Sequence, residues 1–147
     1  MTTIAYKDGV IAADGRITSG DIIATDKRVK RYELSNGVMF LAGNDSALDE
    51  IEARGSLSVG DNLNEDTFNA LFVDHNSNVY ICGADGGIVW MSRCRDKDSN
   101  EAIGSGGAWA LAAMDLGKTA KEAVEYAATR DKNTGGVISE WRINGDI

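Results

Sequence analysis

Polar residues at the ends of predicted strands and helices are the part of this sequence that could perform chemistry. Asp14 ends an apolar run in "AADGR", and Lys30 follows it by sixteen residues. Ser105 lies between glycines in "AIGSGG", and Asp131 and Thr134 follow a predicted helix in "ATRDKNTGG". Taken singly, each has a structural explanation as a turn, a solvated strand face, a helix cap or helix-end polarity. Together they supply hydroxyl, ammonium and carboxylate groups, which is the kind of set that can activate a nucleophile.

The N-terminal segment "MTTIAYKDGVIAADGR" predicts the first hairpin of a sheet. Strands are expected over 2–7 and 10–14, and Asp8-Gly9 between them indicates a tight turn because glycine adopts positive φ. Chain ends usually fray unless something holds them. The residues at the start of this hairpin therefore have either a structural task or a chemical one.

Apolar periodicity and turn residues predict the remaining elements. The segments 45–54, 106–117 and 119–130 are predicted helices, the last with Thr119 and Glu122 at the spacing of a capping box. Sheets packed face to face, with helices outside them, would suit this order of elements. Further strands are expected at 22–25, 29–34, 38–42, 68–74, 78–83, 87–92 and 137–143, with a turn at Asn36-Gly37 and a loop over 55–64.

Length, composition and charge restrict the function classes. A chain of 147 residues predicts one domain over 1–147. The 23 acidic and 15 basic residues give a net charge of −8, which disfavours nucleic acids and anionic membranes as partners. The one basic run, Lys27-Arg28 and Lys30-Arg31, lacks the interleaved aromatic residues that stack on bases. We expect no nucleic-acid partner, no membrane span and no signal peptide.

Metal and phosphate motifs fail on inspection of their spacing. His75 is the only histidine, which excludes a His-pair metal site and a two-histidine relay. Cys82 and Cys94 lack ligand-like or disulfide spacing and indicate reduced thiols, so we expect a cytoplasmic protein. "LGKT" has Ala112 where a phosphate-binding loop needs its first glycine, and "DKDSNE" has Glu101 where a calcium loop needs one. No metal and no cofactor is expected.

Five motifs occur in a fixed order along the chain. They are "TTIAYKDGVIAADGRITSG", the sixteen-residue spacing from Asp14 to Lys30, "FLAGN", "AIGSGG" and "RDKNTGG". In this combination the chain resembles the β subunits of the proteasome, the threonine-peptidase branch of the N-terminal-nucleophile (Ntn) hydrolases. The resemblance runs from Thr2 to about Ile143, nearly the whole chain.

More than one basic residue could align with the catalytic lysine of the family, because Lys27 and Arg28 are close to the expected position. Lys30 is preferred since it also aligns "YELSNG" with the strand and turn that follow the lysine in the family. Thr134 stands where the family usually has serine.

The resemblance implies a role for each site residue. Thr2 would attack the scissile carbonyl while its own α-amine carries the proton; Lys30 would lower the pKa of both groups, and Asp14 would hold Lys30. A free α-amine titrates near pH ~7.7–8.0, against ~10.4 for lysine, so the amine is the better base at cellular pH. The other implied site residues orient the amine or bind the oxyanion: Ser105, Asp131, Thr134 and, through its backbone amide, Gly43.

This mechanism needs Met1 to be removed, because otherwise the free amine belongs to the wrong residue. Thr2 is small enough for ordinary removal of the initiator, and we expect no long propeptide.

The family fold is α+β, a four-layer αββα sandwich, here with shortened helical layers. Only 24 residues separate Gly43 from "FNALFVD", too few for the two long helices of the family. Because one of those helices makes ring contacts, ring assembly is left open. The chain also ends soon after "WRING", which suits a compact bacterial or phage-encoded relative.

The sequence thus predicts a proteasome-like threonine-type endopeptidase that acts on peptides or unfolded proteins. Two alternatives stay open: an Ntn amidohydrolase that acts on a small amide, and an inactive scaffold that keeps the fold. A homo-oligomer is expected, with a ring as one form of it and an unfoldase as a conceivable partner.

Overall fold

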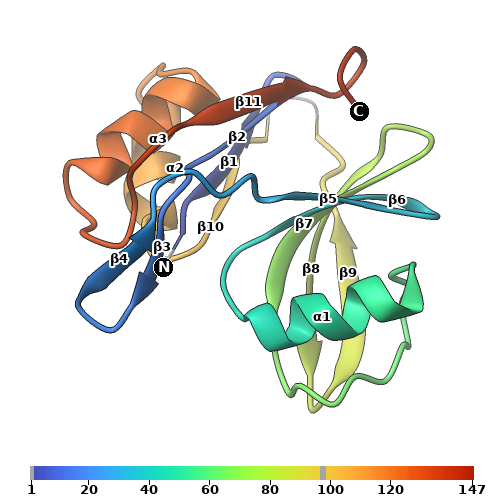
Figure 1. Cartoon of the computed structure of the whole chain (residues 1–147). Helices are drawn as coiled ribbons and strands as arrows, with labels where there is room; N and C mark the ends of the chain where they lie inside the picture. The colour runs from blue at the N-terminus through green and yellow to red at the C-terminus, as the bar shows by residue number, and fades with distance from the viewer. Residues whose placement is uncertain (1, 97–98) are drawn as a thin grey trace. The chain divides into compact units, whose positions relative to one another are not determined.

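The structure is a computed structural model that describes residues 2–96 and 99–147. These residues form eleven strands and three helices, an α+β protein in which every pair of strands within the three sheets is antiparallel. Residue contacts divide the chain into two compact units, Met1–Lys30 with Asp96–Ile147, and Arg31–Arg95. Figure 1 shows both units by their labelled elements.

The first unit contains a four-stranded sheet in the order β10-β1-β2-β11. A separate two-stranded hairpin and two helices complete this unit, and both helices lie against the sheet (Figure 1). The strands are β1 (Ile4–Lys7), β2 (Val10–Ala13), β10 (Glu101–Ile103) and β11 (Ser139–Arg142); the hairpin is β3 (Ile17–Ser19) and β4 (Ile22–Thr25); the helices are α2 (Gly107–Asp115) and α3 (Ala120–Ala128).

Small apolar side chains let the two helices approach this sheet closely. Ala5 and Ala12 on the sheet and Ala110, Ala123 and Ala127 on the helices are all fully buried in one cluster. Because alanine adds little bulk beyond the backbone, the helix axes can lie near the strands and hold them in place.

The hairpin that joins β1 to β2 has the two-residue turn that the sequence predicts. Asp8 and Gly9 have φ values of 51° and 76°, and Lys7 pairs with Val10 on either side of them. Two consecutive positive φ values match the right-handed twist of the flanking strands. This turn sets the register that brings the start of β1 beside the end of β2.

The second unit is a five-stranded sheet in the order β5-β6-β7-β8-β9, with α1 packed on its apolar side chains. Strand β6, the neighbour of edge strand β5, is buried along its whole length, from Gly37 to Leu41. Leu34 pairs with Gly37, so the turn before β6 is Ser35-Asn36, one residue earlier than predicted. The elements are β5 (Arg31–Leu34), β6 (Gly37–Leu41), α1 (Asp45–Arg54), β7 (Asn69–Asp74), β8 (Val79–Asp85) and β9 (Ile88–Arg93).

The α+β class and the three predicted helices are confirmed, whereas some strand predictions were wrong. The strands expected over 2–7 and 29–34 begin only at Ile4 and Arg31, so Lys30 precedes a strand rather than lying in one. β3 and β10 were missed because three residues are too short for an alternating pattern to stand out. The four-layer sandwich and the single domain stay predictions.

No helix among the described residues is long and apolar enough to cross a membrane.

The capping box of α3 provides a test of the local fold. Thr119 Oγ1 accepts from Glu122 N at 3.1 Å, and Thr119 N donates to Glu122 Oε1 at 3.0 Å. Replacing Thr119 by Ala removes the side-chain acceptor, and we expect a loss of about 1 kcal/mol in unfolding free energy, measured by urea denaturation. Thr119→Ser keeps the acceptor and should stay close to the wild type. Equal stability of the Ala and Ser variants would contradict the cap.

Candidate active site

Strand pairing brings four chain segments together at one end of the first unit's sheet. Ile4 at the start of β1 pairs with Ala13 at the end of β2 and with Ile103 at the end of β10. Ala13 also pairs with Ser139 at the start of β11. The residues just before β1 and β11, and just after β2 and β10, therefore meet. These flanking residues include Thr2, Asp14 and Ser105, and Thr134 lies five residues before β11.

Lys30 is the buried cation of this cluster, with only 2% of its surface exposed. Its Nζ donates to Thr2 Oγ1 at 2.8 Å and to Asp14 Oδ1 at 2.7 Å. A third hydrogen bond, of 2.8 Å, goes to the backbone carbonyl of Arg16. An ammonium has three N–H donors, and here each one has an acceptor.

Burial shifts the protonation of this lysine. Desolvation lowers the pKa of Lys30, and the charge and hydrogen bond of Asp14 oppose that shift without cancelling it. Arg28 lowers the pKa of Lys30 further by charge repulsion. The lysine therefore gives up its proton more readily than a lysine in water.

Asp14 is held by the backbone as well as by Lys30. Its Oδ1 accepts from Thr3 N at 3.1 Å, and its Oδ2 accepts from Gly135 N at 3.0 Å. Since a buried carboxylate needs several donors, these amides fix Asp14 in the position from which it pairs with Lys30.

A second cluster centres on Asp131. Its Oδ2 accepts from Ser105 Oγ at 2.5 Å and from Thr134 Oγ1 at 2.7 Å, and its Oδ1 accepts from Asn133 N at 3.1 Å. Burial raises the pKa of Asp131, but the hydrogen bonds from Ser105, Thr134 and Asn133 outweigh it and hold the pKa below its usual range. Asp131 is thus a carboxylate that only accepts hydrogen bonds. The cluster reaches the nucleophile candidate through Thr2 N, which donates to Ser105 Oγ at 3.2 Å.

Glycines in "AIGSGG" allow the serine loop to lie directly on the N-terminal segment. Gly104 has φ 92°, and a Cβ there would lie 1.9 Å from the carbonyl oxygen of Thr2. Gly106 donates its N–H to the same oxygen at 3.4 Å. A side chain at Gly104 would therefore displace Thr2 from its place beside Lys30.

The structure brings six of the seven predicted site residues into one hydrogen-bonded network. Lys30, rather than Lys27 or Arg28, contacts Asp14; Lys27 is exposed. Gly43, the seventh, lies in the second unit on the turn before α1, and its oxyanion role stays a prediction. The six are Thr2, Asp14, Lys30, Ser105, Asp131 and Thr134.

Arg16, Gly135 and Thr3 are among the residues of the network that sequence reasoning missed. Arg16 and Gly135 contribute only a backbone carbonyl and a backbone N–H, which no side-chain pattern indicates. Thr3 contributes a buried hydroxyl 2.7 Å from Thr134 Oγ1. The one available signal for Thr3 was a second threonine directly beside the candidate nucleophile.

Other reactive groups lie outside this network. Burial raises the pKa of the Cys82 thiol to about 12, which makes it a poor nucleophile. No group of three or more His, Cys, Asp or Glu residues in the described ranges could hold a metal ion.

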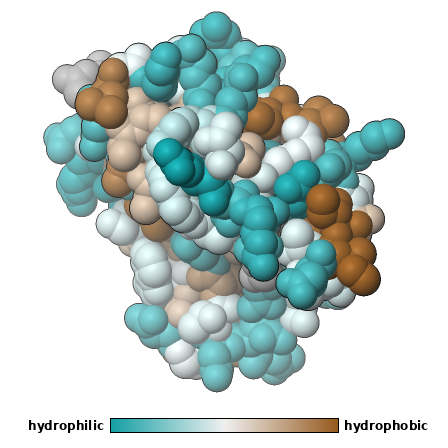
Figure 2. Space-filling model, turned by 90° about the vertical axis from the view of Figure 1, so that its left-hand side faces the viewer, coloured by the Kyte–Doolittle hydropathy of each residue, from teal (hydrophilic) through white to brown (hydrophobic). Residues whose placement is uncertain are grey.

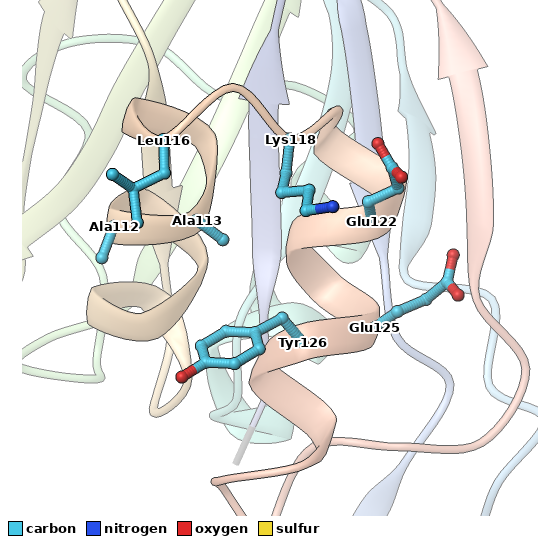
Figure 3. Close-up of a pocket in the computed structure, with 7 residues that line it drawn as sticks. All are labelled: Ala112, Ala113, Leu116, Lys118, Glu122, Glu125 and Tyr126. Carbon is cyan, nitrogen blue, oxygen red and sulfur yellow. The ribbon is translucent and has the colours of Figure 1, made fainter.

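A separate groove lies between α2 and α3 and shares no residue with the network. Figure 3 shows the ring of Tyr126 directed from α3 toward α2. The groove has a volume of about 480 Å³ and is lined by Ala112, Ala113, Leu116, Lys118, Glu122, Glu125 and Tyr126.

The face of the molecule shown in Figure 2 is mainly hydrophilic, with hydrophobic residues in small separate patches.

Solved structures with a similar fold exist. Thiobacillus denitrificans BPH matches with a TM-score of 0.66 and 18% identity, over 99% of this chain and 99% of that chain. Thiobacillus denitrificans BPH in complex with epoxomicin matches with a TM-score of 0.65 and 17% identity, over 95% and 96% of the two chains. At this identity the similarity shows the fold alone. No protein-family model and no curated protein sequence matches the chain.

Gly104 and Gly117 form a matched pair that tests the close contact with Thr2. Both have a positive φ, 92° and 102°, but a Cβ at Gly117 would meet nothing within 4 Å. Gly104→Ala should therefore lower the unfolding free energy by at least about 2 kcal/mol more than Gly117→Ala, because only the first adds a clash with backbone. Urea denaturation measures both, and equal losses would contradict the packing of the serine loop on Thr2.

Proposed function

We propose that this protein is a threonine-type peptidase whose nucleophile is the hydroxyl of Thr2, after removal of Met1. The observation that carries the proposal is the 2.8 Å hydrogen bond from the buried Lys30 ammonium to Thr2 Oγ1. Met1 lies outside the described residues, and its removal is part of the proposal.

A purely structural role explains Lys30 poorly. Burying the ion pair of Lys30 and Asp14 costs several kcal/mol that hydrophobic residues in the same place would not cost. Perturbed, buried cations beside a hydroxyl are typical of sites that activate a nucleophile. The lowered pKa of Lys30 fits that pattern.

The geometry supports the α-amine of Thr2, rather than Lys30, as the base. In its charged form Lys30 has no lone pair to accept a proton, and its three N–H groups donate to Thr2, Asp14 and the Arg16 carbonyl. It can instead stabilise the negative charge that develops on Thr2 Oγ1. The amine then takes the hydroxyl proton, with a pKa near ~7.7–8.0 before any shift.

The reaction proceeds in two steps, acylation of Thr2 and hydrolysis of the resulting ester. Thr2 Oγ1 adds to the scissile carbonyl carbon, the peptide C–N bond breaks, and the amine of Thr2 passes its proton to the leaving amine. Water, deprotonated by the same amine, then hydrolyses the ester and restores Thr2. In this scheme Ser105, Asp131 and Thr134 position the amine, and the Gly43 amide is the proposed oxyanion donor.

The structural neighbour favours peptides over small amides as substrates. That neighbour is in complex with epoxomicin, a peptide epoxyketone and proteasome inhibitor. An epoxyketone of this kind reacts with both the hydroxyl and the amine of a terminal threonine. We extend this class of ligand to the present chain, with peptides or unfolded proteins as substrates. A homo-oligomer, an unfoldase partner and a cytoplasmic location stay predictions.

Epoxomicin labelling tests the nucleophile. Protein that lacks Met1 should gain the mass of one inhibitor molecule, located on the peptide that begins with Thr2, because the addition releases no leaving group. Lys30→Met removes the cation but keeps the length of the side chain, and should slow labelling at least about 100-fold. Lys27→Met, three positions earlier on the surface, is the matched control and should label like the wild type.

Three results would contradict this assignment. Labelling of Lys30→Met at the wild-type rate would show that the cation has no role. No labelling of processed wild-type protein would favour the inactive scaffold, while turnover of small acyl amides but not peptides would favour the amidohydrolase.

The pH dependence of labelling tests the roles of amine and lysine. The rate constant should rise as the amine of Thr2 loses its proton near pH ~8. It should fall again as Lys30 loses its proton, and because burial lowers the pKa of Lys30, this fall should occur below pH 10.5. A rate constant that levels off and shows no fall up to pH 10.5 would contradict a role for the lysine cation.

A further inference from the structure

Thr3 is a buried residue of the network to which the proposed mechanism gives no task. It is fully buried, its N–H donates to Asp14 Oδ1 at 3.1 Å, and its carbonyl accepts from Asp14 N at 3.2 Å. Its hydroxyl lies 2.7 Å from Thr134 Oγ1. Thr3 therefore contacts both the Lys30–Asp14 pair and the Asp131 cluster.

The two threonine hydroxyls lie in a tightly enclosed space. A Cβ at Gly106 would lie 2.1 Å from Thr3 Oγ1 and 2.9 Å from Thr134 Oγ1. Thr134, like Thr3, is fully buried. The contact between the hydroxyls is therefore fixed by packing on all sides, and any hydroxyl that loses its partner here stays without water.

The direction of each hydrogen bond in the Asp131 cluster follows from proton counting. Ionised Asp131 only accepts, so the single protons of Ser105 Oγ and Thr134 Oγ1 both point to its Oδ2. Thr134 Oγ1 then has no proton left for Thr3, and Thr3 must be the donor in that contact. By the same count Ser105 must accept from Thr2 N.

The result is two paths of hydrogen bonds, each with a defined donor direction, that both end on the carboxylate of Asp131. One runs from the Thr3 hydroxyl to Thr134 and then to Asp131, and the other from Thr2 N to Ser105 and on to the same carboxylate. An amine at Thr2 that donates to Ser105 has its lone pair directed away from Ser105. The orientation of the proposed base thus depends on which way the hydroxyls are turned.

We propose that the hydroxyl of Thr3 is a positioning group for the nucleophile: its hydrogen bond holds Thr134 in contact with Asp131, and Asp131 in turn holds the Ser105 hydroxyl that orients the amine of Thr2. This inference rests on the proposed function. It assigns to Thr3 no contact with substrate, so Thr3 acts only through Thr134, Asp131 and Ser105.

Two matched pairs of variants isolate the hydroxyl from the bulk of the side chain. The wild type and Thr3→Val differ by a hydroxyl in place of a methyl group, and Thr3→Ser and Thr3→Ala differ by the same hydroxyl alone. Epoxomicin labelling gives a rate constant at saturating inhibitor and an inhibitor concentration at half saturation. Thermal unfolding shows which variants fold.

We expect the member of each pair that lacks the hydroxyl to label about tenfold more slowly at saturation. The concentration at half saturation should change less than about twofold, because Thr3 touches no inhibitor atom. If Thr3→Val fails to fold, the Ser and Ala variants decide the question, since both lack the methyl group of Thr3 and differ only in the hydroxyl.

Three outcomes overturn the inference. If the saturating rates are equal within both pairs while the wild type is labelled on Thr2, the role of Thr3 is refuted and the proposed function still stands. Folding of Thr3→Ser with unfolding of both Thr3→Ala and Thr3→Val would show that the hydroxyl serves stability. Absence of labelling in the processed wild type would refute the proposed function and this inference together.

Discussion

Burial of the Lys30 ammonium is the constraint on which the site depends. A charge removed from water must find an acceptor for each of its donors, and Lys30 finds them in Thr2, Asp14 and the Arg16 carbonyl. The three acceptors come from different parts of the segment 2–16, so burial of the lysine requires the folded hairpin of β1 and β2. In return, the lysine fixes the position of the Thr2 hydroxyl. Chemistry and folding are therefore linked through one side chain.

The second carboxylate of the site works in a complementary way. Asp131 gathers hydroxyl donors rather than a cation, and its cluster reaches the backbone nitrogen of Thr2, whereas Lys30 reaches the side-chain oxygen. In the proposed mechanism, these two sets of contacts orient Thr2 for proton transfer from its hydroxyl to its own amine. Glycines make this possible, because the loops that carry Ser105 and Thr134 approach the N-terminal segment too closely for side chains at Gly104 and Gly106.

Sequence reasoning found most side chains of the hydrogen-bonded network, but it missed the Thr3 hydroxyl and the backbone groups. Asp14 and Asp131 could be predicted because each follows an apolar segment whose end the sequence shows. The capping box of α3 could be predicted from the spacing of Thr119 and Glu122. The carbonyl of Arg16 was not predictable, because any residue type offers a carbonyl. The strands β3 and β10 were missed because three residues carry no clear alternation. Spacing alone did not separate Lys30 from Lys27; burial and the contact with Asp14 separate them.

The central claim is that Thr2 is a nucleophile whose oxygen and nitrogen both lie within one catalytic network. A crystal structure of the processed protein after reaction with epoxomicin tests it most directly. The account predicts continuous density from the inhibitor to both Oγ1 and N of Thr2, with Lys30 Nζ within hydrogen-bond distance of Oγ1. Density for inhibitor on another residue, or a Lys30 side chain turned away from Thr2, would contradict it.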